Sequence, residues 1–154
     1  MLTNNFYTTV KNEMSRANST LINILGKQVT NVSANNWYTN NNFNTGNFHW
    51  QIQLGNGLTP ASIDDYAIES PITDLTLLAG TATSPDSDKI LKAINATYQN
   101  NTNENITVTE VCLLGYYNSA ELVFLFNREV LGEPVIIAPG EAHSFTCILS
   151  TDNL

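Results

Sequence analysis

The chain has 154 residues and a mass of 16.9 kDa, a length that folds as one domain and buries roughly 70% of its unfolded surface without a metal or a disulfide framework. Only 13% of its residues are charged, and its polarity comes instead from 22 Asn and 18 Thr. Six basic residues against 14 acidic ones give a net charge of −8 and a pI near 4.4. This balance excludes the basic surface that binding to nucleic acid or to an anionic membrane requires.

The first ten residues, MLTNNFYTTV, contain neither the basic stretch nor the apolar stretch of a secretory signal. The longest apolar run covers residues 122–126, far short of the roughly 18 residues that a membrane span needs. We therefore expect the chain to be made and matured in a reducing cytoplasm. In that compartment Cys112 and Cys147 are expected to be buried free thiols rather than a disulfide.

Residues 6–25 predict an amphipathic helix that ends at Gly26, because apolar residues recur at spacings of three and four. The stripe consists of Phe6, Val10, Met14, Ala17, Leu21 and Leu25. It fits either packing on the chain's own core or a docking arm. Residues 1–27 carry a net charge of +2 and the remainder −10, so a docking arm would suit an acidic partner or a sister subunit. We therefore divide the chain into a helical segment, 1–26, and a domain, 27–154.

The following segment, residues 31–47, is crowded with Asn, Thr and Gly, which favour turns. It predicts a long polar loop or a ragged hairpin. Trp37, Tyr38 and Phe43 lie within it, and aromatic rings surrounded by amides could stack on sugar rings. These three side chains are the candidate residues of a carbohydrate-binding site.

From residue 48 the pattern is that of β-structure. Residues 48–54 alternate, which predicts a strand that buries Phe48, Trp50, Ile52 and Leu54 on one face. An irregular crossing segment follows at 58–72. Further strands are expected at 75–83, 90–99, 106–117, 121–130, 134–138 and 143–149, with a hairpin over 90–117 and a type II turn at 138–141. Many short strands at turn spacing predict a mainly β chain: an antiparallel β-sandwich, jelly-roll or immunoglobulin-like, preceded by one N-terminal α-helix.

Residues with catalytic or ligand-binding chemistry are few and scattered. His49 and His143 lie on different predicted strands and are expected at a surface or interface, because no zinc-ligand spacing is present. Asp64-Asp65 with Glu69 could act as an acid–base pair, but a solvated loop or cap is the favoured interpretation. Asp86-Ser87-Asp88 is interpreted as a turn cap rather than a calcium site. We expect no enzymatic activity, no metal and no cofactor.

Three groups of motifs resemble small virion proteins of tailed bacteriophages. The first is LGNGLTPASIDDY at residues 54–66 followed by ESPI at 69–72, with Ala61 where the family has a second proline. The second is TVTEVCL at 107–113, with Cys112 where the family has glycine. The third comprises REVL at 128–131, PV at 134–135 and APGE at 138–141. Together they span about residues 48–150 in the family's order.

The resemblance implies a non-enzymatic β-sandwich subunit of a phage particle, assembled in the host bacterial cytoplasm and located in the virion. We expect an auxiliary or decoration protein of the capsid that binds other virion subunits and itself, with no nucleic-acid or membrane partner. The alternative is a neck, tail or head-fibre adsorption module that binds host carbohydrate. Candidate interface residues are Phe6, Val10, Met14, Leu21, Ile63, Tyr66 and Pro71.

Overall fold

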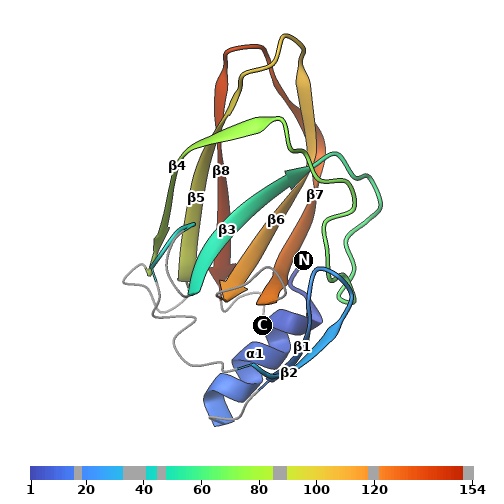
Figure 1. Cartoon of the computed structure of the whole chain (residues 1–154), viewed down its shortest axis with the longest axis vertical. Coiled ribbons are helices and arrows are strands. Elements are labelled where there is room, and N and C mark those ends of the chain that lie inside the picture. The colour runs from blue at the N-terminus through green and yellow to red at the C-terminus, as the bar shows by residue number, and fades with distance from the viewer. Residues whose placement is uncertain (16–18, 33–40, 45–47, 85–89, 118–121, 151–154) are drawn as a thin grey trace.

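The computed structural model describes residues 1–15, 19–32, 41–44, 48–84, 90–117 and 122–150. One short helix and a two-stranded hairpin lie at one end of a body built from two antiparallel three-stranded sheets (Figure 1). The elements are α1 (Asn4–Ser15), β1 (Ser19–Ile22), β2 (Gln28–Val32), β3 (Phe48–Gly55), β4 (Leu75–Thr83), β5 (Ile90–Asn100), β6 (Ile106–Tyr117), β7 (Val123–Ile137) and β8 (Ala142–Ser150).

The two sheets have the strand orders β3-β6-β7 and β4-β5-β8. Their inner faces share one hydrophobic core, to which Trp50 and Phe126 contribute from the first sheet and Ile94 and Leu149 from the second. The expected mainly β sandwich is therefore confirmed. Its assignment as jelly-roll or immunoglobulin-like stays a prediction.

Strand β3 confirms the alternation predicted from the sequence. Phe48, Trp50, Ile52 and Leu54 are all buried. The expectation for His49 is wrong, because its ring is also buried and stacks on Tyr116 with 4.5 Å between the ring centroids. Strand β3 buries side chains on both faces near its start, which period-2 alternation alone does not predict. His143, by contrast, is exposed on β8.

The outer face of the first sheet is also covered. A second apolar cluster forms there from β6 and β7, built by Cys112, Leu114, Val123 and Leu125. Ile24 of the β1–β2 turn and Ile68 of the crossing segment, residues 58–72, pack against this cluster. Both faces of the sheet are therefore buried over residues 111–114 of β6 and 123–126 of β7, and the crossing segment lies on the sheet rather than in solvent.

The N-terminal region differs from the helix predicted over residues 6–25. The helix α1 ends at Ser15, and β1 pairs with β2 in an antiparallel hairpin. Gly26, expected as a helix C-cap, instead lies in the hairpin turn with φ of 73°. The side-chain oxygen of Asn23 accepts hydrogen bonds from the backbone N–H groups of Leu25 and Lys27. An asparagine that binds its own turn in this way favours a turn over helix continuation.

The N-terminal apolar residues belong to the chain's own core. Phe6 is fully buried and its ring meets Phe126 edge-on at 6.3 Å, and Leu21 is 2% exposed. Val10 is half-buried against the same core. The docking-arm interpretation is therefore wrong for Phe6 and Leu21, since neither side chain is open to a partner. The side chain of Met14 lies outside the described residues.

Two strand connections differ from the sequence-based expectation. Residues 90–117 do not form a hairpin, because β5 and β6 lie in different sheets and the turn between them crosses the sandwich. The strands expected at 121–130 and 134–138 are one strand, β7, whose pairing with β6 shifts register between Val130 and Val135. The type II turn is confirmed: Gly140 has φ of 78°, and Glu141 N–H donates to the Ala138 carbonyl at 3.0 Å.

Candidate functional site

The side chain of Arg128 forms hydrogen bonds to four different residues. It lies on β7, opposite Cys112 of β6, and therefore on the outer face of the first sheet beneath the crossing segment. Only 2% of the residue is exposed. A guanidinium in this position must find partners that replace water, because burying an unpaired charge is costly.

Three carboxylates and a carbonyl supply those partners. Arg128 Nε donates to Glu110 Oε1 at 2.5 Å, and Nη1 donates to Asp65 Oδ2 at 2.9 Å. Nη2 donates to the Thr59 carbonyl at 3.1 Å and to Glu69 Oε2 at 3.2 Å. We call Arg128, Glu110, Asp65 and Glu69 the arginine cluster. The arginine cluster joins strands β6 and β7 to the crossing segment.

The carboxylates are also held by the backbone of the crossing segment. Glu110, which is completely buried, accepts the N–H of Glu69 at 2.9 Å and that of Ser70 at 3.4 Å. Asp65 accepts the N–H of Ser62 at 2.8 Å. Glu69 accepts both the N–H and the hydroxyl of Thr59, at 2.9 and 2.7 Å. The cluster therefore fixes the path of the crossing segment as well as its charges.

Two glycines allow this close approach. A Cβ on Gly55 would lie 2.5 Å from Glu110 Oε2 and 2.7 Å from the Ser70 carbonyl. A Cβ on Gly57 would lie 2.6 Å from Glu69 Oε2. Because such distances are sterically forbidden, the sequence GNG both ends β3 and leaves room for the buried carboxylates.

Two side chains of the arginine cluster, Arg128 and Glu69, have pKa values shifted in the direction that favours their charged forms. Burial alone would lower the pKa of Arg128, but its hydrogen bonds to Glu110 and Asp65 outweigh burial and raise it. The hydroxyl and N–H of Thr59 lower the pKa of Glu69. General acid catalysis needs a carboxyl group that keeps its proton near neutral pH. The lowered pKa of Glu69 does not suit that role. Asp65 and Glu69 are ion-paired with Arg128, and Asp65 also caps the backbone N–H of Ser62, so the cap interpretation is confirmed for Asp65.

A second buried cation, Lys92 on β5, has different surroundings. It is fully buried, and its Nζ donates to Asn41 Oδ1 at 2.6 Å and to Ser84 Oγ at 2.7 Å. Burial lowers its pKa from 10.5 to about 8. No ion pair to Lys92 is formed within the described residues.

Both cysteines are free and buried, as expected. Burial raises the pKa of both thiols, to about 12 for Cys147 and further for Cys112. Because the thiolate is the reactive form, these side chains act as small apolar residues.

The outer side of the crossing segment exposes apolar side chains that the arginine cluster holds in place. Leu58 is 72% exposed, and Ile63 and Tyr66 are 43% and 45% exposed. Pro71 is exposed as well. Of the seven candidate interface residues, the structure therefore places Ile63, Tyr66 and Pro71 at the surface and brings them onto one segment.

The candidate carbohydrate-binding residues are only partly described. Trp37 and Tyr38 lie outside the described residues, as does Asp86-Ser87-Asp88. Phe43 is half-buried and packs against the core. Its ring lies so close to Gly80 that a Cβ there would be 2.0 Å from it.

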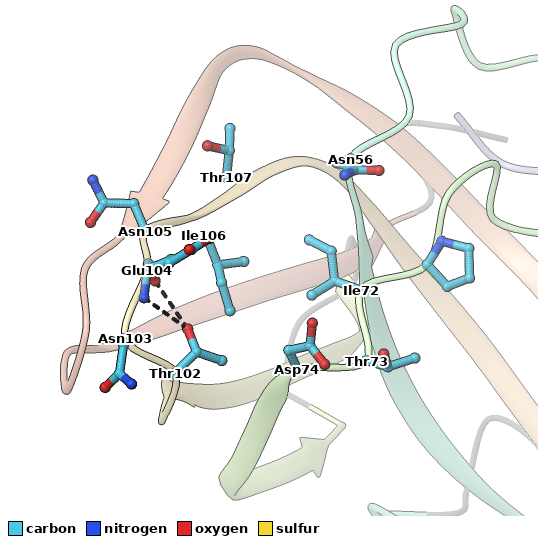
Figure 2. Close-up of a pocket in the computed structure, with 11 residues that line it drawn as sticks. Asn56, Ile72, Thr73, Asp74, Thr102, Asn103, Glu104, Asn105, Ile106 and Thr107 are labelled. Carbon is cyan, nitrogen blue, oxygen red and sulfur yellow. Dashed lines mark hydrogen bonds between the residues drawn. The ribbon is translucent and has the colours of Figure 1, made fainter.

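An open hollow of about 680 Å³ lies between the β5–β6 turn and the start of β4 (Figure 2). Ile72 and Ile106 lie on opposite sides of it, and Asp74 and Glu104 are its acidic residues. The turn is held by Asn100, whose Nδ2 donates to the carbonyls of Glu104 and Ile137. The hollow is thus a polar depression between well-ordered backbone segments.

The described residues form neither a metal site nor a membrane-spanning helix. No group of three or more His, Cys, Asp or Glu side chains is placed there to hold a metal ion. In the same part of the chain, no helix has the length and apolarity needed to cross a bilayer.

Sequence reasoning missed the arginine cluster because its members are far apart; Arg128 and Glu69 are separated by 59 residues. One signal was present. Arg128 follows the apolar run of residues 122–126 and is the single basic residue after Lys92. A lone cation in an apolar strand, if buried, requires polar or acidic partners.

The motifs behind the virion-protein resemblance meet in this cluster. Residues 54–66 supply Asp65, ESPI supplies Glu69, the TEV strand supplies Glu110 and REVL supplies Arg128. Comparison of the chain with protein-family models, curated proteins and solved structures gave no match.

Proposed function

We propose that the chain is a non-enzymatic structural component of a tailed-phage virion, an auxiliary or decoration protein of the capsid that assembles through protein–protein contacts. The observation that carries the proposal is the meeting of three separate motif groups in the arginine cluster. Motifs that resemble a family by chance have no reason to converge on one buried set of contacts. Their convergence supports a shared fold and, through it, a shared structural role.

The crossing segment is the attachment surface in this proposal. It carries exposed Leu58, Ile63 and Tyr66, and the arginine cluster holds its backbone rigid. Apolar side chains on a rigid segment lose little conformational entropy when they bind, so more of the burial energy contributes to affinity. We propose the crossing segment, and not the N-terminal helix, as the attachment surface, because Phe6 and Leu21 are core residues.

Quantitative mass spectrometry of gradient-purified particles from the bacterium that produces the chain tests the proposal. Hundreds of copies per particle are expected for a decoration protein, whereas a ring of about a dozen or fewer would place it at the neck or tail. Absence of the chain from the particles would contradict the proposal. Glycan binding by the purified chain that Trp37→Ala abolishes would instead support the adsorption alternative.

The attachment surface is tested with particles that lack the chain. Recombinant wild-type protein should bind such particles, and Leu58→Asp should not. Ile136→Asp is the matched control, since Ile136 is also strongly exposed, at 61%, but lies on β7 away from the crossing segment. Equal binding by both variants would exclude the crossing segment as the attachment surface.

A further inference from the structure

The two sheets have four outer strands, and three of their free edges are blocked. The edge of β3 is covered at one end by residues 42–44, with Asn44 N–H donating to the Trp50 carbonyl, and at the other by Ile72 N–H donating to the Leu54 carbonyl. Blocking of this kind prevents a strand from pairing with another chain.

The other two blocked edges use different means. The N-terminal residues pair with β7, where Thr3 N–H donates to the Phe126 carbonyl and Leu2 bridges Asn127. Further along β7 the ladder is interrupted before Val135, near Pro134, which has no N–H to donate. The edge of β4 is interrupted by a register shift between Leu77 and Ala79.

The free edge of β8 has none of these features. Residues 142–149 pair with β5 in unbroken register. No described segment other than β5 forms a backbone hydrogen bond with them. The strand contains no Pro, Lys, Arg, Asp or Glu, and its inward side chains Phe145, Cys147 and Leu149 are buried and apolar. By the rules that govern exposed edges, this strand is open to pairing.

Space for a further strand exists beside this edge. A hollow of about 590 Å³ lies between β8 and the N-terminal residues, lined by Thr146, Cys147 and Ile148 on one side and by Leu2, Tyr7 and Glu129 on the other. The outward face of β8 is uncharged too, with exposed Ser144, Thr146 and Ile148.

We propose that β8 is a self-association edge, which pairs antiparallel with β8 of a second copy of this chain to join two β4-β5-β8 sheets into one continuous sheet. A two-fold axis lets each copy donate and accept the same backbone hydrogen bonds, so one surface serves both partners. This inference rests on the edge strands alone and does not depend on the proposed function.

Charge selects a second copy as the occupant. Each chain carries a net charge of −8, so two copies repel each other across most of their surfaces. Because β8 carries no acidic or strongly basic side chain, antiparallel self-pairing places no like charges directly opposite each other.

Mass measurements on purified protein, by sedimentation equilibrium over a range of concentrations, test the proposal with two matched variants. Thr81, Asn95 and Thr146 form one cross-strand row on the exposed face of the second sheet. Thr146→Lys adds a lysine to the β8 edge, whereas Thr81→Lys adds the same charge to the same row on β4. Wild type and Thr81→Lys should be dimers at concentrations where Thr146→Lys is a monomer.

Amide hydrogen exchange provides an independent readout. Protection of residues 142–149 in the wild type should fall on dilution, while that of β5 stays constant. If Thr146→Lys lacks the circular dichroism of the folded protein, Ser144→Lys replaces it. A wild type that is monomeric throughout, a Thr146→Lys variant that still dimerises, or loss of the dimer in both lysine variants would each overturn the proposal.

Discussion

Arg128 and Lys92 are both buried cations in β-strands, yet their environments differ completely. Arg128 is bound by three carboxylates, and its pKa is raised because these hydrogen bonds outweigh burial. Among the described residues Lys92 has an amide and a hydroxyl as partners, and burial lowers its pKa to about 8. A buried positive charge therefore stabilises the folded chain at Arg128 and destabilises it at Lys92.

The difference follows from what each residue connects. Arg128 joins the first sheet to the crossing segment through groups that are themselves hydrogen-bonded. Lys92 reaches Asn41 and Ser84, which are exposed and can exchange their bonds for water. Removing Arg128 leaves the buried carboxylate of Glu110 without its cation, whereas removing Lys92 leaves the accessible polar groups of Asn41 and Ser84.

The largest expected effect is that of Arg128→Met. Breaking a buried ion pair from one side costs about 3–5 kcal/mol, because the remaining charge stays buried, and Glu110 is completely buried. Chemical denaturation at neutral pH measures this loss. Lys27→Met is the control, since it removes an exposed cation and should change stability by less than about 0.5 kcal/mol. A loss as small as that of the control would mean that the arginine cluster holds nothing together.

Lys92→Met should have the opposite sign and stabilise the protein at neutral pH by about 1–3 kcal/mol, because burial lowers the pKa of the lysine to about 8 and so disfavours its charged form. Below pH 8 the lysine is charged in both folded and unfolded chains, so the full cost of burying the charge is present. Between pH 8 and 10.5 only the unfolded chain keeps the proton, so wild-type stability rises with pH. The advantage of the variant should therefore disappear by about pH 10.5. A gain that does not vary with pH would mean that methionine acts by packing alone.

Gly55→Ala should destabilise the protein by about 1–3 kcal/mol through overpacking, because its Cβ would meet Glu110 and the Ser70 carbonyl. Gly132→Ala is the matched control, since a Cβ there has no atom within 4 Å. The thermal midpoints of the two variants provide the comparison. Equal midpoints would show that the crossing segment shifts freely away from β3.

The smallest effect concerns acid sensitivity. The pKa of Glu69 is lowered in the folded chain, so its contribution to stability is present above the ordinary value of 4.5 and is lost as pH falls. Glu69→Gln should be less stable than wild type at pH 7 and lose less stability on acidification. Glu133→Gln removes the same charge from an exposed position. Identical acid profiles for Glu69→Gln and wild type would contradict the stabilisation of the Glu69 carboxylate by its hydrogen bonds from Thr59 and by Arg128.

Local patterns predicted much of the fold. Strands β4 and β6 begin and end at the predicted residues, and the turn at Pro139-Gly140 has the expected geometry, because alternation and turn chemistry depend on near neighbours. The pairing of strands could not be predicted in the same way. A polar turn after Asn100 is compatible both with a hairpin and with a crossing between sheets. Which of the two forms depends on how the strands pack around the shared core, and the local sequence does not encode that packing.

The same limit applies to the candidate site. The spacing of apolar residues correctly marked Phe6 and Leu21 as buried side chains. It did not predict where the helix ends, because the hydrogen bonds of Asn23 and the pairing of β1 with β2 form a hairpin there instead. Asp65 and Glu69 were correctly singled out as adjacent acids. Their cation lies on a strand about sixty residues away, and no local pattern encodes that contact.

A double-mutant cycle between Arg128 and Glu110 tests the central claim most directly, namely that the cluster is one interdependent unit that clamps the crossing segment to the sheet. Glu110→Gln keeps an oxygen that can accept the Glu69 N–H but removes the charge. The account predicts that Arg128→Met with Glu110→Gln is far less destabilised than the sum of the single variants, with a coupling energy of about 2 kcal/mol or more. Additivity within about 0.5 kcal/mol would contradict it.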